Sequence, residues 1–221
     1  MRKRTRSLLA AALVVLVPSL AQAGPPLLCF PMSIDSQSLP WGDGPGWKTP
    51  KAGYDVARLT EDTLALLGPR TPVIARMETL RRAVIYASSD AAAATRLFDA
   101  LRARAGRPDD PKSDPLALFD LGYAVETLRQ AEHGLAKFKV NPPEDGYALV
   151  RTALSRRGKD AEMEYAAALI TTTPTMKAVC DRHLRAALEG APGGSPLAKT
   201  IDAHKPMWGE RLVTVRASAS R

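Results

Sequence analysis

The chain has 221 residues, of which 45% are hydrophobic and 24% are charged. These proportions are typical of a globular protein with a buried core, and they exclude an intrinsically disordered chain. Four of the cations behind the formal charge of +8 lie in the first six residues, and without them 27 basic residues face 23 acidic ones. So small an excess argues against a phosphate-binding face, and we expect no nucleic-acid partner.

Residues 1–23 have the three parts of a Sec-type signal peptide. A basic start is followed by ten uninterrupted apolar residues, Leu8 to Val17, and by the small-x-small motif at Ala21-Gln22-Ala23. Ten residues are about half of what a membrane-spanning helix needs. The sequence therefore predicts cleavage after Ala23, a periplasmic or extracellular product, and no transmembrane anchor after cleavage.

Residues 24–53 contain six prolines, five glycines and two tryptophans, Trp41 and Trp47. Proline fixes φ and glycine loosens the chain, so we expect an extended arm without a helix or a central strand. The tryptophans have two interpretations. They pack the arm over the rest of the protein, or they line a recognition groove, because tryptophan offers much contact area at little entropic cost.

From residue 54 to residue 205 the apolar residues recur with helical spacing, between breaks of glycine and proline. Helices are expected at 54–67, 72–84, 90–105, 113–131, 142–157, 160–170 and 174–190, followed by a short turn at 195–204. Asp90, Asp114 and Asp160 stand at N-cap positions. The residues from 206 to 221 form a C-terminal tail, in which 212–215 fit either a helical turn or a short strand. The chain is thus predicted to be all-α, with antiparallel helical hairpins forming a compact bundle or a short solenoid-like array.

The helix expected at 113–131 has apolar residues on nearly every side, which predicts the central element of the fold. It also carries Asp120 and Glu126, and a buried carboxylate requires a partner or a shifted pKa. We expect a structural ion pair with an arginine such as Arg81 or Arg82. The alternative is a catalytic pair of carboxylates.

Cys29 and Cys180 are the only cysteines of the chain. In an oxidising compartment an even pair favours a disulfide, and we expect these two residues to form one. The alternative is a reactive thiol, because Cys180 and His183 share a helix face. That face is apolar, however, which favours a structural cysteine.

The motifs that identify common enzymes, metal sites and cofactor sites are absent from the sequence, and no cofactor or metal ion is expected. Glu162 and Glu164 are two residues apart and do not share a helix face. The favoured hypothesis is an exported, non-catalytic helical module that binds a protein or peptide partner, with Trp41 and Trp47 at its binding groove. The alternative is an enzyme that uses Cys180 with His183, or Asp120 with Glu126.

Overall fold

The computed structural model describes residues 24–138 and 142–219, and within these ranges it is all-helical, as predicted. The predicted signal peptide lies outside the described residues. The α-helices are α1 (Pro26–Cys29), α2 (Leu59–Leu66), α3 (Val73–Ala87), α4 (Ala91–Ala105), α5 (Pro115–Ala131), α6 (Gly146–Arg157), α7 (Ala161–Ile170), α8 (Lys177–Gly190), α9 (Pro196–Ala203), α10 (Lys205–Trp208) and α11 (Glu210–Ala219). Short 3₁₀ turns at Val56–Arg58 and Pro174–Met176 precede α2 and α8.

The three predicted aspartate caps are confirmed. The side chain of Asp90 accepts a hydrogen bond from the backbone of α4, Asp114 does so for α5, and Asp160 does so for α7. Each carboxylate satisfies a backbone N–H group that has no partner within its helix. Local sequence signals therefore decide where these helices begin.

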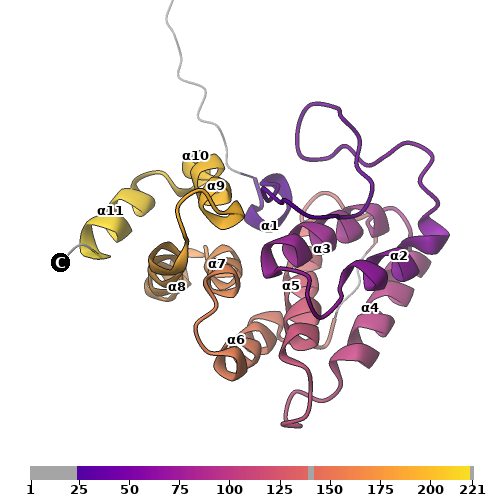
Figure 1. Ribbon diagram of the computed structural model, residues 1–221. Helices are drawn as coiled ribbons and strands as arrows, with labels where there is room; N and C mark the ends of the chain where they lie inside the picture. Colours follow the sequence, from indigo (N-terminus) through magenta and orange to yellow (C-terminus); the bar gives the residue numbers. More distant parts are fainter. Residues whose placement is uncertain (1–23, 139–141, 220–221) are drawn as a thin grey trace, which may run out of the picture.

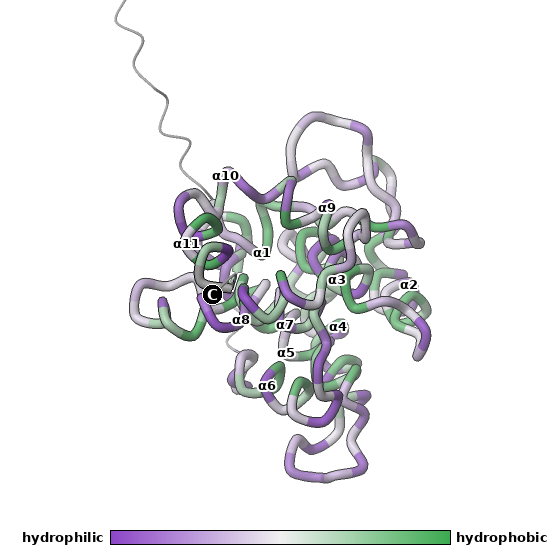
Figure 2. Tube along the Cα trace, turned by 60° about the vertical axis from the view of Figure 1, so that its left-hand side comes forward, coloured by the Kyte–Doolittle hydropathy of each residue, from purple (hydrophilic) through white to green (hydrophobic). Residues whose placement is uncertain are grey.

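Helix α5 is the central element, as its apolar surface predicts. It packs against α1, α3, α4, α6 and α7, with α2–α4 on one side of it and α7–α11 on the other (Figure 1). Its closest neighbour is α6, because Gly122 and Gly146 face one another. A Cβ atom on Gly122 would lie 2.6 Å from the carbonyl oxygen of Gly146, so only glycine allows this approach. Figure 2 shows hydrophobic segments toward the middle of the molecule and hydrophilic segments along its outlying loops.

Helix α3 is buried along almost its whole length, including the charged residues Arg76, Glu78 and Arg81. In the sequence, Arg76 and Arg81 lie off the apolar stripe of this helix, and a stripe alone predicts that they are exposed. Arg81 is buried because the chain between α1 and α2 crosses its side of α3, whereas Arg76 is enclosed by the connection between α2 and α3 and by Asp120 of α5. Arg81 donates hydrogen bonds to the carbonyl oxygens of Leu28 and Trp47, at 2.9 and 3.0 Å.

Glu78 is the anion that balances this part of α3. Its carboxylate accepts hydrogen bonds from Arg81, from Arg82 and from the backbone N–H of Met32, at 2.7 to 3.0 Å. Burial raises the pKa of Glu78, but the bonds from Arg81 and the charges of both arginines outweigh it, so the net pKa is lowered. The network ties α1 and the following segment to α3.

The predictions for the two ends of the described chain need correction. Residues 24–53 were expected to contain no helix, but Pro26–Cys29 form the short helix α1, with Leu27 and Leu28 buried. Residues after 205 were treated as a tail, yet they form α10 and α11. The uncertainty over 212–215 is decided in favour of a helix, because Leu212 and Val215 bury one face of α11.

A buried hydrogen-bond chain connects these ends to the core. The Tyr165 hydroxyl lies 2.7 Å from Nδ1 of His204 and accepts a bond from the indole N–H of Trp208 at 3.1 Å. Nε2 of His204 lies 3.0 Å from the carbonyl oxygen of Pro31. The C-terminal helices are therefore held by specific polar contacts with α7 and with the segment after α1.

In the part of the chain that the structure describes, no helix combines the length and the apolar character that a membrane span requires.

Candidate functional site

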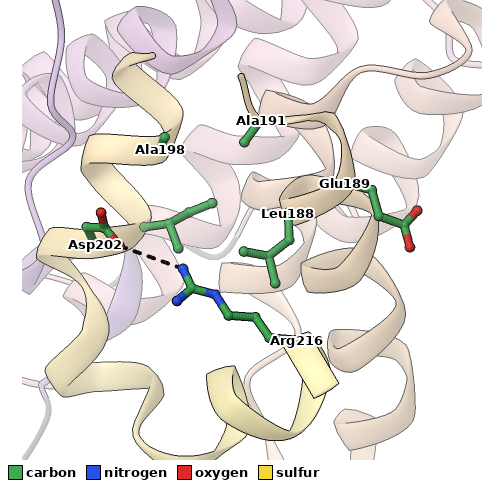
Figure 3. Close-up of a pocket in the computed structure, with 7 residues that line it drawn as sticks. Leu188, Glu189, Ala191, Ala198, Asp202 and Arg216 are labelled. Carbon is green, nitrogen blue, oxygen red and sulfur yellow. Dashed lines mark ion pairs between the residues drawn. The ribbon is translucent and has the colours of Figure 1, made fainter. Parts of the chain in front are cut away.

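A pocket of about 430 Å³ lies where α8, α9 and α11 meet (Figure 3). Its lining combines apolar and charged side chains, namely Leu188, Ala191, Ala198, Ile201, Glu189, Asp202 and Arg216. The small alanine side chains leave the space, and Leu188 and Ile201 make its floor apolar. Such a combination of an apolar floor and a few charged groups is typical of binding pockets.

Arg216 lines this pocket from α11. Its side chain extends from α11 toward α9, where a guanidinium nitrogen lies 3.7 Å from a carboxylate oxygen of Asp202 (Figure 3). The same Asp202 oxygen also pairs with Lys205 at 2.9 Å. About half of the Arg216 and Asp202 side chains is exposed, so this pair can rearrange around a ligand at little energetic cost.

The structure places Trp41 and Trp47 in different surroundings. Trp41 packs edge-on against Tyr86, and the guanidinium groups of Arg81 and Arg82 lie 5.2 and 5.4 Å from its ring. Trp41 therefore packs against α3, in agreement with the first of the two interpretations of the tryptophans. Trp47 instead lines a cavity of about 250 Å³ with apolar and polar neighbours, namely Pro25, Leu28, Lys48, Gln130, His133, Gly134 and Leu135.

The expected disulfide between Cys29 and Cys180 is absent, and both cysteines are free. The Cys180 thiol is buried between α7 and α11, where it donates to the carbonyl oxygen of Ala168 at 3.3 Å and accepts from Arg211 at 3.0 Å. Cys29 is the last residue of α1, and its side chain lies beside Gly24, which precedes that helix. The two sulfur atoms thus have different neighbours. The sequence could not show this, because it does not indicate which residues the fold places beside each cysteine. Burial raises the pKa of both thiols, which disfavours a reactive thiolate.

Asp120 forms the expected buried ion pair, but with different arginines. Its carboxylate lies 2.6 Å from Arg76 and 3.4 Å from Arg104, not beside Arg81 or Arg82. Arg76 also donates to the carbonyl oxygens of Leu67 and Gly68, so the network holds the connection between α2 and α3. Burial raises the pKa of Asp120 to about 6, despite both arginines.

Glu126 does not join Asp120 in a pair of carboxylates. It bonds Arg129 of its own helix and lies against Gly146, at the junction of α5 with α6. Nothing in these contacts brings two carboxylates to one substrate. The arrangement of both residues is that of structural ion pairs.

His183 has partners that the sequence did not predict. Its Nδ1 atom lies 2.5 Å from a carboxylate oxygen of Glu164 on α7, and its Nε2 atom lies 2.8 Å from the hydroxyl of Tyr147 on α6. Cys180, on the same helix, instead contacts Ala168 of α7 and Arg211 of α11. The sequence indicated only that Glu164 and Glu162 point in different directions, and Glu162 indeed accepts from the backbone N–H of Ile74 instead.

Within the described residues, no group of three or more histidine, cysteine, aspartate or glutamate side chains is placed to hold a metal ion. No protein-family model, curated protein or solved structure matches the chain significantly. The function therefore has to be argued from the geometry of this chain.

Proposed function

We propose that the protein is an exported helical module that binds a protein or peptide partner in the cell envelope or outside the cell. The observation that supports this proposal is the pocket between α8, α9 and α11. Its volume of about 430 Å³ falls in the range of about 300–1,000 Å³ that ligand sites occupy. A space of this size accepts one large apolar side chain of a partner on the floor formed by Leu188 and Ile201.

The charges around the pocket suit a peptide better than a purely apolar ligand. Glu189 and Asp202 are carboxylates at its edge, and Arg216 is a cation that can bond a carbonyl oxygen or a carboxylate. Export is part of the proposal and is supported by the pattern of residues 1–23. The cavity beside Trp47 is smaller, and we assign no partner to it.

Filling the pocket tests this proposal. A random linear peptide library is selected against the purified protein, and bound peptides are measured by fluorescence anisotropy with the wild type and with Ala198→Trp. The control is Ala178→Trp, because Ala178 is exposed on α8 and lines none of the described pockets. We expect Ala198→Trp to weaken binding at least about tenfold, which corresponds to about 1.4 kcal/mol, and the control to leave it unchanged. A library that yields no peptide able to distinguish the two variants contradicts the proposal.

A further inference from the structure

Tyr147, His183 and Glu164 form a directed chain of hydrogen bonds across three helices. A carboxylate only accepts, so Nδ1 of His183 carries the proton that faces Glu164 at 2.5 Å. In the neutral imidazole, Nε2 then has a free lone pair, and the Tyr147 hydroxyl donates to it at 2.8 Å. This assignment follows from the hydrogen-bond partners. A hydroxyl, a base and a carboxylate that orients the base are the three parts of a nucleophilic site.

This chain is open to solvent, whereas the similar pair of Tyr165 and His204 is closed. The side chains of His183 and Glu164 are 15% and 23% exposed, and Tyr147 is half-buried. His204 is 2% exposed, and it bonds a backbone carbonyl group where His183 bonds a carboxylate. The first chain therefore lies at the surface of the protein, whereas the second is enclosed.

The charges near Tyr147 favour an anion of low charge. The guanidinium carbon of Arg151 lies 5.8 Å from the centre of the tyrosine ring, and Arg182 precedes His183 on α8. Burial is the largest influence on the pKa of Tyr147 and raises it, and the charges of the two exposed arginines oppose this shift without reversing it. Glu164 and Asp145 lie close enough to act in the opposite direction. Two cations balanced by two carboxylates suit a singly charged phosphodiester better than a doubly charged monoester.

We propose that Tyr147 is the nucleophile of a phosphodiester-cleaving site, with His183 as general base and acid and Glu164 as the residue that positions His183. The Tyr147 oxygen forms a bond to phosphorus as its proton passes to Nε2 of His183, and the alkoxide or phenolate leaves from the opposite side of phosphorus and takes a proton from solvent water. Water then attacks phosphorus opposite Tyr147 and releases a proton to solvent, and the bond from phosphorus to Tyr147 breaks as the imidazolium of His183 returns its proton to the tyrosine oxygen. The products are one alcohol and one phosphate monoester. Arg151 and Arg182 stabilise the phosphoryl oxygens during both steps.

The site is independent of the peptide pocket, because none of these five residues lines the pocket between α8, α9 and α11. It is held by rigid elements, since Tyr147 follows Gly146 at the close contact of α6 with α5. Nucleophile, base and positioning residue come from three different helices whose packing fixes their distances. Failure of peptide binding thus leaves this proposal unaffected, and failure of this proposal leaves peptide binding unaffected.

The test uses bis(para-nitrophenyl) phosphate as the substrate and the purified protein as the enzyme. We expect a burst of para-nitrophenolate stoichiometric with the protein, and acid quenching to trap a para-nitrophenyl phosphoryl group on Tyr147, detected by peptide mass spectrometry. Tyr147→Phe abolishes the burst and the adduct. His183→Asn lowers kcat by about 10²- to 10⁴-fold, the contribution of a general base.

Two further variants separate a catalytic chain from a structural one. Glu164→Gln lowers kcat and leaves KM unchanged, because Glu164 positions His183 and does not contact the substrate. Tyr54→Phe is the matched control, since it also removes a half-buried tyrosine hydroxyl bonded to a carboxylate, that of Asp62 at 2.8 Å. It retains the wild-type rate. The absence of turnover in the wild type, or equal rates in wild type and Tyr147→Phe, overturns the proposal, and the chain then serves only to join α6, α7 and α8.

Discussion

Around α3, Arg81 and Glu78 are fully buried, whereas on α8 His183 keeps 15% of its side chain exposed. The buried pair is enclosed by the backbone of α1 and of the segment that follows it, and both side chains bond several groups. The chain through His183 also has short hydrogen bonds, but it reaches solvent. Burying a charge is costly unless partners surround it, so the first arrangement stabilises the fold. The second arrangement combines hydrogen-bond partners with exposure to solvent, and a reacting site requires both.

The largest effect is expected from breaking the buried pair. Arg81→Met keeps much of the side-chain volume but leaves Glu78 with fewer partners and two backbone carbonyl groups unbonded, so we expect a loss of about 3–5 kcal/mol in the free energy of unfolding. His183→Asn, at the partly exposed chain, is expected to cost about 1–2 kcal/mol, because it removes ordinary hydrogen bonds. Urea denaturation of both variants measures the difference. Equal losses of unfolding free energy in the two variants would mean that the buried pair contributes no more to stability than the partly exposed chain.

The contact of α5 with α6 connects the core to the exposed chain. Gly122→Ala places a methyl group 2.6 Å from the carbonyl oxygen of Gly146, so the helices must separate. We expect a loss of about 1–3 kcal/mol, the usual cost of overpacking, together with displacement of Tyr147 from His183. The control is Gly193→Ala, where an added Cβ has no heavy atom within 4 Å. Thermal unfolding compares the two variants, and a loss of stability in both would indicate a general intolerance of alanine instead.

The pH dependence of stability tests the effect of burial on the carboxylate of Asp120. Burial raises the pKa of Asp120 to about 6 in the folded state, above the unfolded value of 3.8, so the folded state binds this proton more tightly. Its contribution to stability is present at low pH and is lost as the pH rises through 6, by at most about 1.4 kcal/mol per pH unit. Asp120→Asn should remove this slope between pH 4 and 6 in urea titrations. An unchanged slope would show that Asp120 does not titrate there.

The smallest structural effect concerns the two thiols, one in α1 beside α3 and the other in α8, the helix of His183. Because Cys29 and Cys180 are free, alkylation of the denatured protein without reductant should add two labels. Intact mass spectrometry of the purified protein measures this and also reports whether the chain starts at Gly24, as the predicted cleavage requires. A protein that takes up labels only after reduction would restore the disulfide predicted from the sequence.

The sequence predicted the elements of this fold better than their partners. The order of helices α2 to α8, the caps at Asp90, Asp114 and Asp160, and the central position of α5 follow from periodicity and capping signals between neighbouring residues, whereas α2 and α6 begin a few residues later than expected. The sequence predicted the correct helix for the partner of Asp120 but the wrong arginine, because the partner is Arg76 and not Arg81 or Arg82. All of these arginines lie off the apolar stripe of α3, and the sequence does not show which of them faces α5. His183 was recognised as a candidate, but Cys180 was taken as its partner because both lie on one helix.

The sequence alone determined that the described chain is all-helical, because local hydrogen bonds and the spacing of apolar residues act over a few positions. Only the tertiary structure decided that Glu78 and Arg81 of α3 are buried, since the segment between α1 and α2 that covers them has no periodic signal. It also decided that Tyr147, Glu164 and His183 meet. These residues lie on three helices, and their contact depends on how α6, α7 and α8 pack, which includes the close approach at Gly122 and Gly146.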